Sequence, residues 1–280
     1  MTRFFFVRGK AILFTMDNMK LPLLLIGLFL LLSCQTRETS KVVDDPEFTE
    51  SPTDPSTSYP ADMTDVFTAH GGIEAWQNMQ ALSFEIEKEE GTEKHFINLW
   101  DRHDRVEGAN FTMGFDGSNV WIKADSTYKG DPTFYHNLMF YFYAMPYVLG
   151  DEGIKYLETE PLEFDGITYP GIRIAYNQGV GVSSKDEYFI HYHPETKQMA
   201  WLGYTVTYFS QEASSDVHWI RYDHWQEING LKLPKSVSWY NYQDGQPVDL
   251  RNTVSFTNVT LSTQELDQAL FEKPTGAVIQ

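Results

Sequence analysis

The sequence has a single cysteine in 280 residues, Cys34, so the chain cannot form an internal disulfide. Basic residues are also few: 21 Lys and Arg stand against 39 Asp and Glu, giving a formal net charge of −18. A chain of this sign repels phosphate backbones, which argues against a nucleic acid partner. Without a disulfide, a folded domain must be stabilised by its core. Aromatic residues, 15% of the chain, can supply that core.

The chain also lacks an apolar run long enough to span a bilayer, which needs about 20 residues. The run Leu21–Leu32 is shorter and follows Met19 and Lys20, a pattern typical of a signal peptide. Translation can start at Met19 or at Met1, because the longer N-terminus also carries basic residues. Neither start changes the prediction of an exported protein.

A lipoprotein processing motif follows this run directly. Leu31, Leu32 and Ser33 precede Cys34, so a branched apolar residue stands three positions before the cysteine and a small residue one position before it. A small residue lets the signal peptidase approach the bond, and the thiol accepts the lipid. We expect residues 1–33 to be the signal peptide and Cys34 to be the lipid anchor.

The chain after the cysteine divides into a tether and one domain. Residues 34–60 are rich in Ser, Thr, Asp, Glu and Pro and have almost no periodic apolar residues, so we expect a lipidated, disordered tether. Residues 61–280 are expected to form a single β domain. Removal of residues 1–33, which carry four basic residues and one acidic residue, changes the formal net charge from −18 to −21.

One helical segment is predicted at the start of this domain. Val66, Ala69, Ile73 and Trp76 recur at helical spacing. The pair Gly71-Gly72 lies in the middle, where glycine costs about 1 kcal/mol relative to alanine. We therefore expect a break or a close packing contact at the two glycines.

Strand patterns dominate the rest of the domain. Apolar residues recur at alternate positions in four runs, which are Leu82–Ile86, Ile172–Tyr176, Tyr188–Tyr192 and Leu202–Tyr208. Residues that favour turns separate such runs at Asp116-Gly117, Asp165-Gly166, 193–196, Asn229-Gly230 and Asp244-Gly245. These features predict a meandering antiparallel sheet. In the later run 217–225, Trp219 and Trp225 lie on one expected face and Ile220 and Tyr222 on the other, which indicates that both faces are covered.

The segment Asp131–Leu149 is the exception to the strand pattern. Asp131 can cap a helix, Pro132 suits its first turn, and Pro146 ends it. The residues between are apolar on nearly all sides, so the predicted helix must be enclosed, most simply in the concavity of a curved sheet.

Four motifs together resemble an uncharacterised lipoprotein family of Bacteroidota-type bacteria. The motifs are AHGG-x-x-AW (69–76), DG-x-x-VW (116–121), MPYVLGDEG (145–153) and DHW-x-x-x-NGLKLP (223–234). That family is similar in design to the LolA/LolB lipoprotein carriers and to the sensor RseB. The resemblance implies a mainly β fold, in which a curved antiparallel half-barrel packs on an N-terminal helix and an aromatic central helix. It also implies that the concave side holds acyl chains, although the segment Asp131–Leu149 could plug it.

Six apolar residues are candidates for such a pocket: Trp76, Phe134, Leu138, Tyr141, Phe142 and Met145. Ordinary core packing explains the same spacing.

Two polar patterns suggest other chemistry. His191 and His193 lie two residues apart on an expected strand, with Glu187 on the same side, as a metal site would need. A solvated face explains this alternation equally, and we expect neither a metal nor a cofactor. Asp101, Asp104, Asp186 and Asp223 could form an acid/base pair only if the fold brings them together, and no nucleophile or metalloprotease motif occurs in the chain.

The sequence thus favours a non-enzymatic lipoprotein, anchored in the outer membrane and facing the periplasm or the exterior, which binds an apolar ligand or a lipidated partner. We expect it to be a monomer. One alternative is a plugged structural or interaction module of the outer membrane. A secreted hydrolase is the third.

Cys34→Ala should move the protein from the membrane fraction to the soluble fraction, because the thioether to the lipid can then no longer form. Fractionation and intact mass of the processed chain measure this change. Gln35→Ala, the matched control, should stay lipidated. A Cys34→Ala protein that still carries lipid would exclude this anchor.

Overall fold

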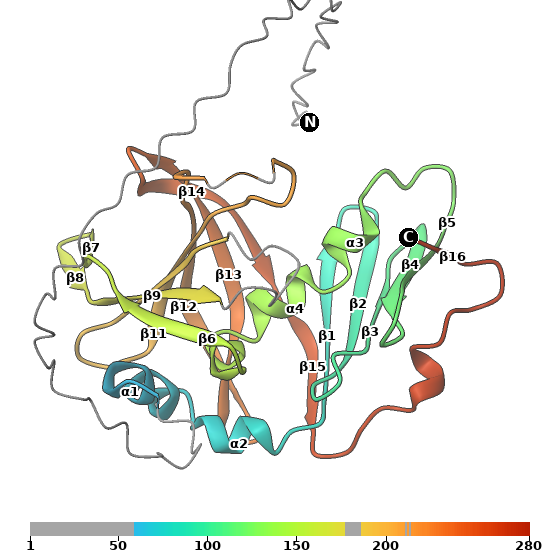
Figure 1. The fold of residues 1–280 in the computed structure, drawn as a ribbon, viewed down its shortest axis with the longest axis horizontal. Coiled ribbons are helices and arrows are strands. Elements are labelled where there is room, and N and C mark those ends of the chain that lie inside the picture. Colours follow the sequence, from blue (N-terminus) through green and yellow to red (C-terminus); the bar gives the residue numbers. More distant parts are fainter. Residues whose placement is uncertain (1–58, 177–185, 211, 213) are drawn as a thin grey trace, which may run out of the picture. The chain divides into compact units, whose positions relative to one another are not determined.

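The computed structural model describes residues 59–176, 186–210, 212 and 214–280 (Figure 1). The expected signal peptide, Cys34 and nearly all of the expected tether lie outside these residues. Within the described part, no helix has both the length and the hydropathy that crossing a membrane requires.

Two short helices open the domain, α1 (Ala61–Ala69) and α2 (Ile73–Gln77). The predicted break falls between them, at Gly71 and Gly72, whose φ angles are 104° and 95°. The backbone there approaches the turn at Asn229-Gly230, since the amide of Lys232 donates to the His70 carbonyl at 2.8 Å. Position 71 therefore requires glycine for two reasons: its φ angle is positive, and another backbone segment approaches it closely.

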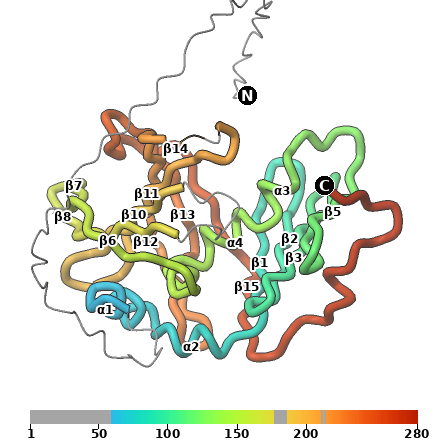
Figure 2. Tube along the Cα trace, in the orientation of Figure 1, coloured from blue at the N-terminus to red at the C-terminus, as the bar shows by residue number. Residues whose placement is uncertain are grey.

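Sheet A contains seven antiparallel strands in the order β15-β1-β2-β3-β4-β5-β16. The strands are β1 (Ala81–Lys88), β2 (Gly91–Asn98), β3 (Asp104–Glu107), β4 (Phe111–Phe115), β5 (Val120–Ala124), β15 (Thr257–Ser262) and β16 (Val278–Ile279). After β15 the chain passes through the short helix η2 (Gln268–Leu270) and returns to pair with β5 (Figure 2).

Sheet B also contains seven antiparallel strands, in the order β14-β13-β12-β11-β10-β9-β6. The strands are β6 (Ile154–Glu158), β9 (Gly171–Tyr176), β10 (Tyr188–Tyr192), β11 (Met199–Tyr204), β12 (His218–Ile228), β13 (Leu231–Gln243) and β14 (Gln246–Ser255). A separate hairpin is formed by β7 (Leu162–Phe164) and β8 (Ile167–Tyr169). Over the residues that the structure describes, neither sheet closes on itself, so the predicted mainly β half-barrel architecture is confirmed.

All five predicted turns connect consecutive strands. In three of them an Asp or Asn with a φ of 51–53° precedes a glycine with a φ of 76–79°, at residues 165–166, 229–230 and 244–245. Two successive positive φ angles match the right-handed twist of the flanking strands, which is why these dipeptides predicted hairpins correctly.

The aromatic segment is helical but broken. It contains α3 (Pro132–Tyr135), α4 (Leu138–Tyr143) and the 3₁₀ helix η1 (Tyr147–Gly150) in place of one continuous helix. The predicted cap is present, because the Asp131 carboxylate accepts from the amide of Phe134 at 3.2 Å. Aromatic residues lose rotamer freedom in a helix, so packing decides the conformation here.

This segment fills the interior of the domain. Phe142 contacts the rings of Tyr204 and Trp239 in sheet B, and Tyr143 contacts those of Phe84 and Phe256 at 4.6 and 4.4 Å. One apolar cluster joins α1, α2, α4 and η1 to the inner faces of both sheets. Figure 1 shows α4 near β1 and β13.

Two strand predictions need correction. The run that begins at Leu202 ends as a strand at Tyr204, because the backbone beyond it pairs differently: the amide of Thr207 donates to the Asp186 carboxylate at 2.7 Å. In β12, both faces are covered as predicted. However, register shifts near His224 place Trp219 in the outer cluster and Trp225 against the main core, so the two do not share a face.

Gly71→Ala should destabilise the domain more than Gly72→Ala. Both substitutions force alanine to a positive φ, at a cost of about 1–3 kcal/mol. A Cβ on Gly71 would also collide with the carbonyl oxygen of Gly230, whereas a Cβ on Gly72 meets nothing within 4 Å. Urea unfolding should show an extra loss of about 1 kcal/mol or more for Gly71→Ala. Equal losses would contradict the close contact.

Candidate functional site

A cleft of about 270 Å³ lies between α2, the β2–β3 loop and η1. Its lining residues are Ile73, Trp76, Gln77, Met79, Leu99, Trp100, Arg102, Tyr147, Gly150 and Asp151. α2, which begins directly after the Gly71-Gly72 break, contributes Ile73, Trp76 and Gln77 to this cleft, and the β2–β3 loop contributes Leu99, Trp100 and Arg102.

The floor of the cleft is aromatic and rigid. The rings of Trp76 and Tyr147 stack at 4.7 Å with an interplanar angle of 8°, and both side chains are buried. The Tyr147 hydroxyl lies 2.5 Å from the His70 carbonyl oxygen and 3.0 Å from that of Lys232. Burial raises the pKa of Tyr147, so this hydroxyl stays a donor at neutral pH.

The rim of the cleft is polar. Arg102 Nη2 lies 2.7 and 2.5 Å from the two carboxylate oxygens of Asp151, and the guanidinium is 5.2 Å from the ring centre of Phe140. Burial raises the pKa of Asp151, and the Arg102 charge opposes that rise. Arg102 has a φ of 60°, which is uncommon for a residue with a side chain of this size.

A second set of polar groups is enclosed between sheet A and the aromatic segment. His136, just after α3, places Nδ1 2.5 Å from Asp104 Oδ2 on β3. On β2, His95 Nε2 lies 2.7 Å from Glu93 Oε1, and the Tyr135 hydroxyl donates to the same oxygen at 2.7 Å. The two histidines and two carboxylates are all buried.

Burial and pairing act differently on the two carboxylates. Burial raises the pKa of Asp104 and outweighs the opposing effect of His136. Burial also favours a higher pKa for Glu93, but the hydrogen bonds and charges of His95, Lys88 and Tyr135 outweigh it, so that pKa is lowered. Burying a charged side chain costs free energy, and the hydrogen bonds and opposite charges of its partners offset that cost.

The six candidate pocket residues do not line one common space. Trp76 lies in the floor of the cleft, while Phe142 and Met145 are buried in the main core. Leu138 is partly buried against that core, and Tyr141 is 37% exposed. Phe134 packs at the surface against the rings of Tyr208 and Phe209.

The metal candidates are also separated. His191 is buried beside Trp219, with Nδ1 3.3 Å from the Tyr169 carbonyl oxygen. His193 lies in the following turn, where its Nδ1 accepts from the amide of Glu195. Glu187 pairs with Arg173 at 2.7 Å. Within the described residues, no group of three metal-binding side chains comes together.

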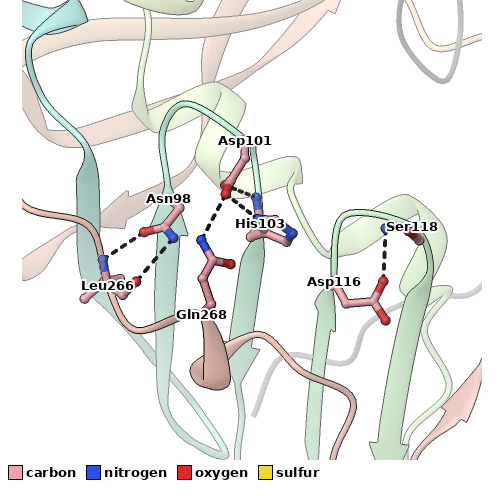
Figure 3. A network of polar contacts seen from close by, with 7 residues as sticks. All are labelled: Asn98, Asp101, His103, Asp116, Ser118, Leu266 and Gln268. Carbon is pink, nitrogen blue, oxygen red and sulfur yellow. Dashed lines mark hydrogen bonds and ion pairs between the residues drawn. The ribbon is translucent and has the colours of Figure 1, made fainter.

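The four candidate aspartates each have a different local partner. Asp101 pairs with His103 and accepts from Gln268 (Figure 3), while Asp186 accepts from Thr207. Asp223 pairs with Arg221, and Asp104 pairs with His136. The fold thus groups Asp104 with Glu93 and the two histidines, which was not predicted from the sequence. The spacing of Glu93, His95 and Ile97, on one face of β2, was the available signal.

No protein-family model and no curated protein matches the sequence. Among solved structures, the domain is similar to a DUF1329 family protein from Desulfovibrio piger, with 12% identity and a TM-score of 0.44 over 76% of this chain and 98% of that chain. It is also similar to a LolA superfamily protein from Nitrosomonas europaea, with 10% identity and a TM-score of 0.44 over 74% and 96%. The lipoprotein LppX of Mycobacterium tuberculosis has 10% identity and a TM-score of 0.23 over 52% and 88%. These similarities concern the fold alone.

His136→Ala should lower the free energy of unfolding by about 3–5 kcal/mol, because it leaves the Asp104 carboxylate buried without its partner. Chemical unfolding at pH 7 measures the loss. His224→Ala is the matched control: this side chain is 69% exposed beside Asp223, so the loss should stay within about 0.5 kcal/mol. The Asp104→Ala/His136→Ala double variant should lose less than the two single variants together. Additive losses would show that the two residues are not coupled.

Proposed function

We propose that this chain is a lipid-anchored, non-enzymatic protein of the cell envelope, held in the outer membrane by Cys34. Its half-barrel would bind an acyl chain or a lipidated partner. The observation that carries the proposal is the single apolar cluster that lines both sheets and contains α4 and η1. Apolar side chains of the aromatic segment make the contacts that an acyl chain would make in the same space.

The aromatic segment that fills this space consists of short helices. α4 has six residues and η1 has four, and helices of this length have little stability of their own. Withdrawal of the segment would therefore cost mainly its packing contacts, which a ligand of similar chemistry would replace. This exchange is the step that acyl binding requires.

A plugged interaction module is the second candidate, and the polar anchors of the segment favour it. The Tyr222 hydroxyl donates to the Phe142 carbonyl at 2.8 Å, and Asp104 holds His136. These contacts resist withdrawal. The Asp104–His136 pair does not by itself favour a hydrolase, because neither residue lines the cleft between α2, the β2–β3 loop and η1, and both side chains are buried.

Native mass spectrometry of residues 35–280 distinguishes the first two candidates. The carrier proposal expects co-purified lipid or one bound fluorescent acyl probe per chain. Phe142→Ala should increase probe affinity several-fold, because it empties space beside Trp239 and Tyr204, although it costs about 3–5 kcal/mol of stability. If the alanine variant does not fold, the same measurement is made on Phe142→Leu, which removes less buried volume.

Phe209→Ala is the matched control, since Phe209 is 70% exposed and lies outside the main core. Its probe affinity should equal that of the unsubstituted protein. Absence of lipid and of probe binding in both the unsubstituted protein and the Phe142 variants would favour the plugged module.

A further inference from the structure

We propose that the cleft between α2, the β2–β3 loop and η1 is a carbohydrate site. In this site Trp100 is the stacking platform, and the Arg102–Asp151 pair with Gln77 binds the hydroxyl groups of a neutral saccharide. The site is distinct from the acyl-binding interior of the proposed function. It rests on the presentation of Trp100 and on the mixed chemistry of the cleft.

Trp100 is exposed yet held in place. Its side chain is 66% accessible, although burying a large apolar side chain is worth about 1.5–3 kcal/mol. The indole Nε1 donates to the Met79 carbonyl at 3.0 Å, which fixes the ring beside the cleft. The amide of Arg102 donates to the Asn98 carbonyl at 3.0 Å, so the loop that carries Trp100 is itself closed. A fixed, exposed indole loses little entropy when a ligand stacks on it.

The two sides of this loop have separate contacts. Asp101 and His103 interact with each other, and Asp101 also accepts from Gln268 in the C-terminal segment (Figure 3). Trp100 and Arg102 line the cleft instead. The hairpin therefore has a structural side tied to the C-terminal segment and a side that remains available to a ligand.

The chemistry of the cleft suits a ligand with both apolar faces and hydroxyl edges. Trp76, Met79 and Leu99 provide an apolar floor, and charged and amide groups stand at the rim. The Arg102 and Asp151 side chains at this rim are 28% and 42% exposed, so their accessible donor and acceptor atoms can reach the hydroxyl groups of a ligand. An acyl chain would instead cover the ion pair without offering it any hydrogen bond.

The volume of the cleft and the net charge of the chain restrict the class of ligand further. The volume of about 270 Å³ is near the lower limit of small-molecule pockets, about 300 Å³, and suits a ring-sized group better than a long chain. The net charge of −18 disfavours acidic sugars. A quaternary ammonium group could also stack on indole, but the Arg102 charge at the rim opposes it.

Calorimetry of the full processed protein in detergent micelles tests the site. The probes are maltotetraose, cellotetraose and triacetylchitotriose at concentrations up to about 10 mM. Choline, a quaternary ammonium compound, is tested as the alternative ligand. At least one saccharide should bind with one site per chain. Trp100→Ala should weaken that binding at least tenfold, Trp100→Phe should weaken it less, and Phe209→Ala, which removes another exposed aromatic ring, should leave it unchanged.

Three results would overturn the assignment: no binding of any of the three saccharides, equal binding by Trp100→Ala, or binding of choline in their place. Unfolding curves for Trp100→Ala confirm that the variant is folded, as expected for an exposed side chain. The acyl probe measured on the same variants separates the two proposals. Its binding should not depend on Trp100, so a failure of the saccharides would leave the carrier proposal intact.

Discussion

Both sheets depend on one aromatic segment that fills the space between their inner faces. Phe142 packs on Trp239 of sheet B and Tyr143 on Phe84 of sheet A, so α4 joins the two seven-stranded sheets, which also meet where Asn229 donates to the Leu261 carbonyl. With no disulfide available, this burial is the main source of stability. The hydrogen bonds between His136 and Asp104 and between Tyr135 and Glu93 then hold the segment against sheet A.

Much of the fold follows from local rules that act over a few residues. Alternation in Leu82, Phe84 and Ile86 predicts β1, and the Asp-Gly and Asn-Gly pairs predict hairpins, since both depend on neighbouring residues alone. The break at Gly71-Gly72 follows in the same way. The aromatic segment was predicted to be enclosed, but its division into α3, α4 and η1 was not, because tertiary packing decides it.

The site was less accessible to sequence reasoning for a physical reason. The cleft combines α2, a hairpin loop and η1, and the contact between Arg102 and Asp151 crosses 49 positions in the chain. Asp104 and His136 are similarly distant in sequence. Trp76 was identified from its helical spacing, whereas Trp100 gives no periodic signal because it lies in a loop. Register shifts in β12 were also hidden, and they reverse the face on which Trp225 lies.

Tyr59, the first residue that the structure describes, is held firmly to the domain by its side chain. Its hydroxyl donates to the Gly150 carbonyl at 2.9 Å, and its ring packs against Phe67 and Tyr156. Gly150 is also part of the cleft lining. A pull applied to the chain at Tyr59 would therefore load the cleft wall at Gly150 and sheet B at Tyr156 together, so the shape of the cleft would respond to force on this end of the domain.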